Sequence, residues 1–229
     1  MYYKFLDPEH VTNVLDRGTL VVSSFRYFRE LESRWGAIAD PLEGATELKV
    51  PKDYIVTEQS EKLKQINEAG IGLEMFKQFV RVESGGVIDL SGASFVHQLP
   101  DTYIFSASWG CLDQLKTNMC DSAERPYRAC LKIRSLHRLE HQIFDEGRIL
   151  ELGVPFSQVF ERGQRGIVRY EARANSLPAA VLPPSALIKA PRFEHQQEAR
   201  VTFLPRGPID HQRITISIPR PLSVFKMMF

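Results

Sequence analysis

The segment KAPRFEHQQEARVTFLP, residues 189–205, passes from polar, charged residues directly into an apolar run typical of a strand. Gln196, Glu198 and Arg200 follow one another at intervals of two. On a strand, residues two apart project from the same face. The spacing therefore predicts an amide, a carboxylate and a guanidinium directed into one cleft. The ordinary alternative is a strand start whose polar residues face solvent.

A second pair of polar residues lies within the apolar, aromatic segment 103–109. Ser106 and Ser108 are again two apart, and serine is not enriched in strands. The pair therefore has one of two explanations: two hydroxyls facing a functional cleft, or two small residues that leave room for close packing.

The histidines and cysteines do not form a recognisable motif. His137 and His141 would share a helix face, but the glutamate that follows the first histidine in metalloproteases is missing and no third ligand is indicated. We therefore expect no metal site. The three cysteines, Cys111, Cys120 and Cys130, have no C-x-x-C spacing, which argues against a zinc site and a disulfide framework. They are expected to be buried, reduced thiols.

The helices and strands that must position these residues alternate in the first part of the chain, and strands predominate in the later part. Residues 2–6 and 19–22 read as strands around a helix that begins at Pro8. Residues 29–50 read as a loop or lid, and residues 52–84 as a helical insert. Further strands are expected at 87–90, 102–108, 128–133, 166–170, 199–204 and 213–218. This order predicts a single α+β domain over residues 1–229 and disfavours a Rossmann fold.

Composition bounds the function without naming it. The 229 residues include 29 Lys plus Arg and 28 Asp plus Glu, a formal net charge of +1. This balance excludes a strongly basic nucleic-acid coat, although a local basic patch is compatible with it. Neither a signal peptide nor a run of about 18 apolar residues is present. We expect a cytoplasmic protein without a membrane partner.

Three short motifs resemble those of ADP-ribosyltransferase-like folds. The opening strand with Tyr3 and Lys4 corresponds to the first motif, although the family carries arginine or histidine there. Phe105-Ser106-Ala107-Ser108 resembles the aromatic-S-x-S motif, and Gln196-Gln197-Glu198 resembles the Q-x-E turn. The resemblance implies a split β-sandwich with an early helical insert.

The chain is more specifically similar to the bacterial family known as domain of unknown function 2971. The similarity is carried by short matches spread over about residues 2–204: Tyr3-Lys4-Phe5, residues 18–23, residues 40–43, Phe105-Ser106, residues 167–170, and Lys189 with residues 196–200. In this chain Asp40-Pro41 lies farther from the strand ending at Ser24 than in the family pattern.

The resemblance implies that NAD is the substrate. Glu198 would stabilise the positive charge that develops on the ribose as the bond to nicotinamide breaks. Gln196 would orient the acceptor. The other implied binding residues are Ser106 and Ser108 at the nicotinamide end, Ser23, Lys4 at the pyrophosphate, Tyr3 or Tyr170 stacked on nicotinamide, and Arg200 as a phosphate contact or a partner of a carboxylate.

Three classes of function follow. The first is an NAD-dependent ADP-ribosyltransferase or NAD-cleaving enzyme of a toxin or antiphage system, with an unassigned protein or nucleic-acid acceptor. The second is a catalytically inactive module on the same fold that binds a nucleotide or a partner, which the unusual first motif favours. The third is an unrelated α+β interaction protein. The apolar residues 224–229 either dock on the domain or mediate a homodimer.

Overall fold

A computed structural model describes residues 1–32, 44–57, 87–121, 127–172, 174–176 and 184–229. The chain divides into two compact units. Unit 1 comprises residues 1–43, 100–170 and 186–229, and unit 2 comprises residues 44–99 and 171–185. The two units are described separately.

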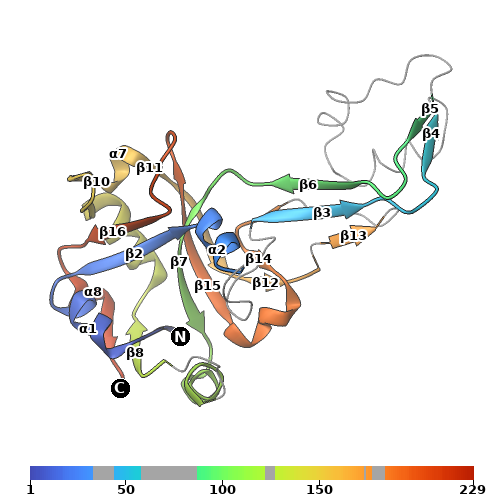
Figure 1. Ribbon diagram of the computed structural model, residues 1–229. Coiled ribbons are helices and arrows are strands. Elements are labelled where there is room, and N and C mark those ends of the chain that lie inside the picture. Colours follow the sequence, from blue (N-terminus) through green and yellow to red (C-terminus); the bar gives the residue numbers. More distant parts are fainter. Residues whose placement is uncertain (33–43, 58–86, 122–126, 173, 177–183) are drawn as a thin grey trace. The chain divides into compact units, whose positions relative to one another are not determined.

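Unit 1 is built on an antiparallel sheet. Its strands are β1 (Tyr2–Leu6), β2 (Thr19–Ser24), β7 (Tyr103–Trp109), β8 (Ala129–Ile133), β9 (Arg148–Ile149), β10 (Val154–Pro155), β11 (Phe160–Ile167), β15 (Glu198–Pro205), β16 (Arg213–Ser217) and β17 (Phe225–Met227). They pair in the order β10-β9-β16-β2-β7-β1-β8-β17, and β11 joins β15. Strand β15 joins β7, beside which it lies in Figure 1. A separate parallel pair joins β12 (Arg169–Tyr170) to β14 (Ile188–Lys189).

Short helices connect these strands. They are α1 (Pro8–Leu15), α2 (Phe25–Glu32), α5 (Leu112–Lys116), the π-helix η1 (Thr117–Asp121), α6 (Leu136–His141), the π-helix η2 (Gln142–Glu146), α7 (Phe156–Val159), the 3₁₀ helix η3 (Pro191–Gln196) and α8 (Pro221–Val224). Proline at the first position suits the start of α1, because its missing N–H would have no partner there. At the start of α6, the Ser135 side chain accepts a hydrogen bond from the Arg138 N–H, as an N-cap does.

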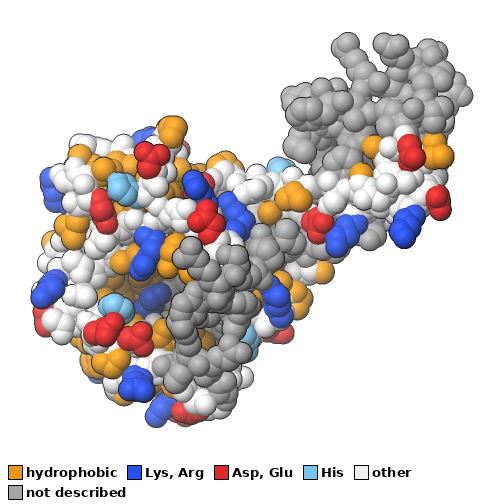
Figure 2. Space-filling model, in the orientation of Figure 1, with side chains coloured by type: hydrophobic (Ala, Val, Ile, Leu, Met, Phe, Trp, Pro, Cys, Tyr) orange, Lys and Arg blue, Asp and Glu red, His pale blue; other side chains and the backbone are white. Residues whose placement is uncertain are grey.

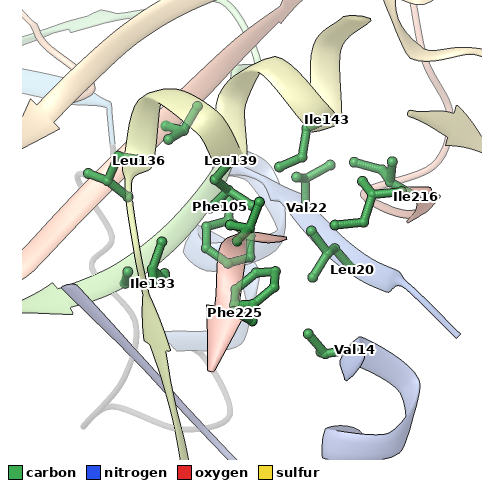
Figure 3. Packing of buried hydrophobic residues seen from close by; sticks show 14 of the residues in the cluster. Val14, Leu20, Val22, Phe105, Ile133, Leu136, Leu139, Ile143, Ile216 and Phe225 are labelled. Atoms are coloured by element: carbon green, nitrogen blue, oxygen red, sulfur yellow. The ribbon is translucent and has the colours of Figure 1, made fainter. Parts of the chain in front are cut away.

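The two faces of the sheet bury different cores. Leu6 and Leu131 belong to the main cluster, in which side chains from β2, β7, β16 and β17 converge with α6 (Figure 3). Tyr3, Phe5 and Cys130 belong to a second cluster that includes Leu112, Leu115 and Met119 from α5 and η1. Alternate residues of β1 and β8 thus serve opposite faces, as the period of a strand requires.

The sheet is split beside the middle of β7. Along one edge β7 pairs with β15 from Tyr103 to Ser108. The other edge is shared: β2 pairs with Tyr103 and Ile104, and β1 pairs with Ser108 and Trp109. Among the described residues, no strand pairs with this edge over 105–107, so β1 and β2 diverge there.

Unit 2 contains short strands only among its described residues. These are β3 (Ala45–Lys49), β4 (Ile55–Thr57), β5 (Val87–Asp89), β6 (Ser94–Gln98) and β13 (Ala174–Ser176). The central β3 pairs antiparallel with β6 and parallel with β13, and β4 pairs with β5. Buried Leu48 and Val50 supply apolar contacts in this unit.

The predicted α+β class is confirmed at the level of a mixed, mostly antiparallel structure. The prediction of a loop over residues 29–50 is wrong at both ends, where α2 and β3 form. The predicted insert at 52–84 includes the strand β4, and its residues 58–84 lie outside the described residues. The chain forms two compact units, and the single domain over residues 1–229 stays a prediction.

Two further sequence expectations concern surfaces and membranes. The C-terminal segment docks on unit 1, since β17 pairs with β8 and buries Phe225. Acidic and basic side chains are interspersed on the visible face of the described residues (Figure 2). Within the described part of the chain, no helix has the length and apolar character needed to cross a bilayer.

Candidate active site

A pocket of about 180 Å³ lies at the split in the sheet of unit 1. Residues of β1, β2 and β7 line it, together with Phe28 of α2, Met119 of η1, and Tyr127. Seven of the residues singled out from the sequence line this pocket: Tyr3, Lys4, Ser23, Ser106, Ser108, Gln196 and Glu198. The fold therefore gathers residues from widely separated parts of the chain at one place.

Glu198 is the central acidic group of the pocket. It is the first residue of β15 and is 6% exposed. Its Oε1 accepts hydrogen bonds from Ser106 Oγ at 2.5 Å and from Arg200 Nε at 2.7 Å. Its Oε2 accepts from Lys189 Nζ at 3.0 Å and from Arg200 Nη2 at 3.1 Å. Both oxygens are thus fixed by side chains that line or underlie the pocket.

These contacts determine the charge of Glu198. Burial by itself would raise its pKa, because a low-dielectric interior disfavours the charged form. The positive charges of Arg200 and Lys189 and the hydrogen bonds from Arg200 and Ser106 outweigh burial and hold the pKa of Glu198 well below its ordinary value. The pocket therefore contains a buried carboxylate that is ionised at neutral pH.

Lys189 links Gln196 to Glu198. It lies on β14 and is 5% exposed, and its ammonium donates to Gln196 Oε1 at 2.8 Å as well as to Glu198. The same ammonium lies 4.7 Å from the ring centroid of Phe193, a cation–π distance. Lys189 is part of the sequence motifs, but only the structure shows that it bridges Gln196 and Glu198.

Gln196 and Glu198 both reach the pocket, but not from one strand as predicted. Gln196 ends the 3₁₀ helix η3 rather than lying on a strand, and β15 begins only at Glu198. Gln197 between them adopts a left-handed conformation with φ 42° and ψ 57°. The prediction that both side chains share a strand face is therefore wrong, although both line the pocket.

The same-face prediction is confirmed for Glu198 with Arg200 and for Ser106 with Ser108. In the β15–β7 register Glu198 is opposite Ser108 and Arg200 is opposite Ser106. The alternate residues Phe105 and Val201 face the main core instead. The two serines and the ion pair thus share one face of the sheet.

Arg200 and Tyr170 do not line the pocket. Arg200 is fully buried, and its Nη1 donates to the Ala186 carbonyl at 2.7 Å. Of its two expected roles, the structure therefore supports that of a carboxylate partner and not that of a phosphate contact. The Tyr170 hydroxyl accepts a hydrogen bond from the Glu198 N–H at 2.7 Å, a contact that supports β15 rather than a stacked ring. Burial raises the pKa of Tyr170 to about 12.

Lys4 is the second pocket cation. Its ammonium donates to the Ser106 carbonyl at 2.8 Å and lies 4.9 Å from the Phe105 ring centroid. Burial lowers the pKa of Lys4 to about 8, and the attraction of Glu198 opposes that shift only in part. Ser106 therefore contacts Glu198 through its side chain and Lys4 through its backbone.

Tyr3 and Ser23 complete the predicted set. Tyr3 is buried, and its hydroxyl donates to the Met1 sulfur at 3.3 Å, so the residue packs in the second core as well as lining the pocket. Phe28, Met119 and Tyr127 were not anticipated from the sequence. Their positions depend on how α2, η1 and the segment after η1 pack against the sheet, for which no local motif provides a signal.

The other sequence candidates lie outside the pocket. His141 contacts Asp145 and Glu146, and the described residues contain no cluster of three or more potential metal ligands. All three cysteines are free, but the expectation that they are buried holds only for Cys130, since Cys111 is exposed. Burial raises the pKa of Cys130 to about 12, which makes a thiolate unfavourable at neutral pH.

This arrangement can stabilise positive charge and can bind an oxyanion. A carboxylate fixed in a partly dehydrated pocket acts on a developing cation more strongly than one in water. The ammonium groups of Lys4 and Lys189 are suited to anionic groups. No protein-family model matches the chain, and neither the curated proteins nor the solved structures include a significantly similar one.

Proposed function

We propose that unit 1 is an ADP-ribosyltransferase-like domain that binds NAD at the split in its sheet and cleaves the bond between nicotinamide and ribose. The observation that carries this proposal is the Glu198 side chain at the pocket, held by Ser106, Lys189 and Arg200. The resemblance of Phe105–Ser108 and Gln196–Glu198 to the motifs of that fold supports the same assignment.

Each group then has a defined task in the cleavage. As the C–N bond breaks, positive charge develops on the ribose, and nicotinamide leaves with the bonding electrons. Glu198 stabilises that charge, as a carboxylate does in the cleavage of glycosides. Ser106 holds the carboxylate in place, so that little reorganisation is required when the charge develops.

The size of the pocket limits which part of NAD it encloses. Its volume of about 180 Å³ is below the roughly 300–1,000 Å³ of typical pockets for drug-sized ligands. The nicotinamide and its ribose would occupy this space, while the pyrophosphate and adenosine would lie outside it. Lys4 would reach the pyrophosphate as a point charge without the bidentate geometry of an arginine.

A second candidate function is favoured by the contacts of Glu198. Both carboxylate oxygens already accept hydrogen bonds from cations, which reduces the charge available to the ribose. The opening strand also carries Lys4 where the related folds have arginine or histidine. A module that binds the nucleotide without cleaving it accounts for these two features.

Binding and cleavage measurements on the purified chain separate the two candidates. Ligand binding to the native state raises the melting temperature by mass action. The enzyme proposal predicts stabilisation by NAD together with time-dependent nicotinamide release, measured by liquid chromatography. Stabilisation without release supports the binding module, and the absence of both contradicts both candidates. A toxin or antiphage role, which the family resemblance suggests, would be tested by expression in bacteria.

A further inference from the structure

The hydrogen bond between Lys189 and Gln196 fixes which end of the Gln196 amide faces the cation. An ammonium group has three donors and no acceptor, so only a carbonyl oxygen can bond to it. The oxygen Oε1 therefore faces Lys189, at 2.8 Å. The Nε2 group, which has two donors and no acceptor, is consequently on the side of the amide away from Lys189.

Lys189 is itself held too firmly to allow the opposite orientation. Its ammonium also donates to Glu198 Oε2 and lies over the Phe193 ring. At 5% exposure, the side chain has little contact with water that could replace these partners. Reversing the Gln196 amide would place its NH₂ group against a buried positive charge, which low-dielectric surroundings make unfavourable.

The chemistry that Gln196 offers therefore does not suit a guanidinium group as the acceptor of ADP-ribose. A guanidinium group has donors only, so it cannot bond to the Nε2 donors of Gln196. It would also approach the positive charges of Lys4 and Lys189, which outnumber the single carboxylate, Glu198, among the described residues that line the same pocket. An acceptor group with oxygen lone pairs and negative charge matches both features.

We infer that the group receiving ADP-ribose is an oxyanion, a phosphate or carboxylate oxygen, which Gln196 Nε2 binds and which the pocket lysines attract. This inference rests on the proposed function and specifies its acceptor. In the transfer, the acceptor oxygen forms a bond to the ribose carbon that carries nicotinamide. The C–N bond breaks, its electron pair leaves with nicotinamide, and the ionised acceptor has no proton to lose.

The state of Glu198 agrees with an acceptor that needs no deprotonation. Its carboxylate is bound by two cations and a hydroxyl, and its lowered pKa makes it a weak proton acceptor. A guanidinium, which keeps its proton far above neutral pH, would require a strong base before it could attack. A phosphate or carboxylate is already nucleophilic at neutral pH.

A transfer assay tests the inference with small acceptors. Adenylate-labelled NAD is incubated with the full chain and with phenyl phosphate, N-acetylglutamate or agmatine, in separate reactions. We expect labelled product with phenyl phosphate or N-acetylglutamate at a level at least roughly tenfold above that with agmatine, the effect of one charge-assisted hydrogen bond. The two oxyanion reactions distinguish phosphate from carboxylate. A larger yield with agmatine overturns the inference.

A matched pair of variants attributes this preference to Lys189. In Lys189→Gln the neutral amide can donate or accept, so that Gln196 can reverse, and the ratio of agmatine to oxyanion product should rise. Lys226→Gln removes an exposed lysine of β17 and should leave the ratio unchanged. The ratio of agmatine product to oxyanion product does not depend on the fraction of each protein that is folded. An equal ratio in Lys189→Gln and in the parent chain contradicts the assignment.

A binding measurement keeps the inference testable without any cleavage. The side-chain amide resonance of Gln196, assigned by its loss in Gln196→Glu, is followed during titration with inorganic phosphate, acetate and agmatine. We expect it to shift with phosphate or acetate and to stay in place with agmatine. A shift with agmatine alone overturns the inference, and so does the absence of a shift with all three ligands. If the Gln196 resonance shifts with phosphate or acetate but no nicotinamide is released from NAD, only the proposed cleavage is contradicted.

Discussion

Ser106 and Glu198 are joined by a 2.5 Å hydrogen bond that runs diagonally between β7 and β15. In the strand register Ser106 is opposite Arg200, and Glu198 is opposite Ser108. Diagonal neighbours on one sheet face are within reach of longer side chains. This hydrogen bond links the Glu198 carboxylate to β7, the strand beside which the sheet is split. Ser106 and Glu198 therefore lie together at the pocket.

The ion pairs of Glu198 should make folding stability depend on pH. Its folded-state pKa lies below the ordinary value of 4.5, so the unfolded chain binds the proton first as the pH falls. The stabilisation is therefore complete above about pH 4.5 and is lost progressively as the pH drops toward the folded-state pKa.

Urea unfolding of the parent chain and Glu198→Gln checks this dependence. At pH 6.5 we expect the variant to be less stable by about 3–5 kcal/mol, because Arg200 and Lys189 lose a buried counter-ion. At pH 3.5 the difference should be smaller. An equal difference at both pH values would show that the charge of Glu198 does not contribute to stability.

Tyr170→Phe should destabilise unit 1 without altering the pocket lining. The Tyr170 hydroxyl is the acceptor for the Glu198 N–H at 2.7 Å. Removing it leaves a buried donor without that partner, which costs about 1–3 kcal/mol. Thermal unfolding measures the loss. A melting temperature equal to that of the parent chain would mean that another acceptor, such as water, replaces the hydroxyl.

Gln197 should tolerate glycine better than valine. Its left-handed φ of 42° costs a residue with a Cβ atom roughly 1–2 kcal/mol, and glycine avoids this cost. Among the described residues, the buried Oε1 of Gln197 also has no hydrogen-bond partner. We expect Gln197→Gly to unfold near the parent temperature and Gln197→Val well below it. The reverse order would indicate that the turn is not left-handed.

The Lys4 amine should react at an unusually low pH. Its pKa is lowered to about 8 because burial disfavours the ammonium form. Competitive acetylation followed by peptide mass spectrometry should give a midpoint near pH 8 for Lys4, and NAD should protect the amine. A midpoint near the ordinary value of 10.5 would contradict the burial of this cation.

Local patterns in the sequence predicted the main strands of unit 1 and the positions of several site residues. The two-residue period placed Glu198 with Arg200, and Ser106 with Ser108, because both pairs lie on regular strands. The period failed for Gln196, since a 3₁₀ helix and a left-handed residue precede β15. A two-residue period places side chains on one face only where the backbone is a regular strand.

The remaining features depend on contacts between distant parts of the chain. Lys189 reaches Glu198 because the parallel β12–β14 pair lies close to β15, and no local pattern encodes that pairing. The split arises from the divergence of β1 and β2 along one edge of β7. Short edge strands such as β17 depend likewise on a partner strand, so their sequences carry little signal of their own.

Nicotinamide release from NAD by Glu198 variants shows whether the Glu198 carboxylate stabilises the developing charge on the ribose. Glu198→Asp keeps the negative charge for Lys189 and Arg200 but withdraws the carboxylate by one methylene, and Lys226→Gln serves as the surface control. We predict release by the parent chain and by Lys226→Gln, and a loss of roughly 100-fold or more in Glu198→Asp, with melting temperatures confirming that each protein is folded. Equal release by the folded Glu198→Asp variant and the parent chain would show that Glu198 does not have this role.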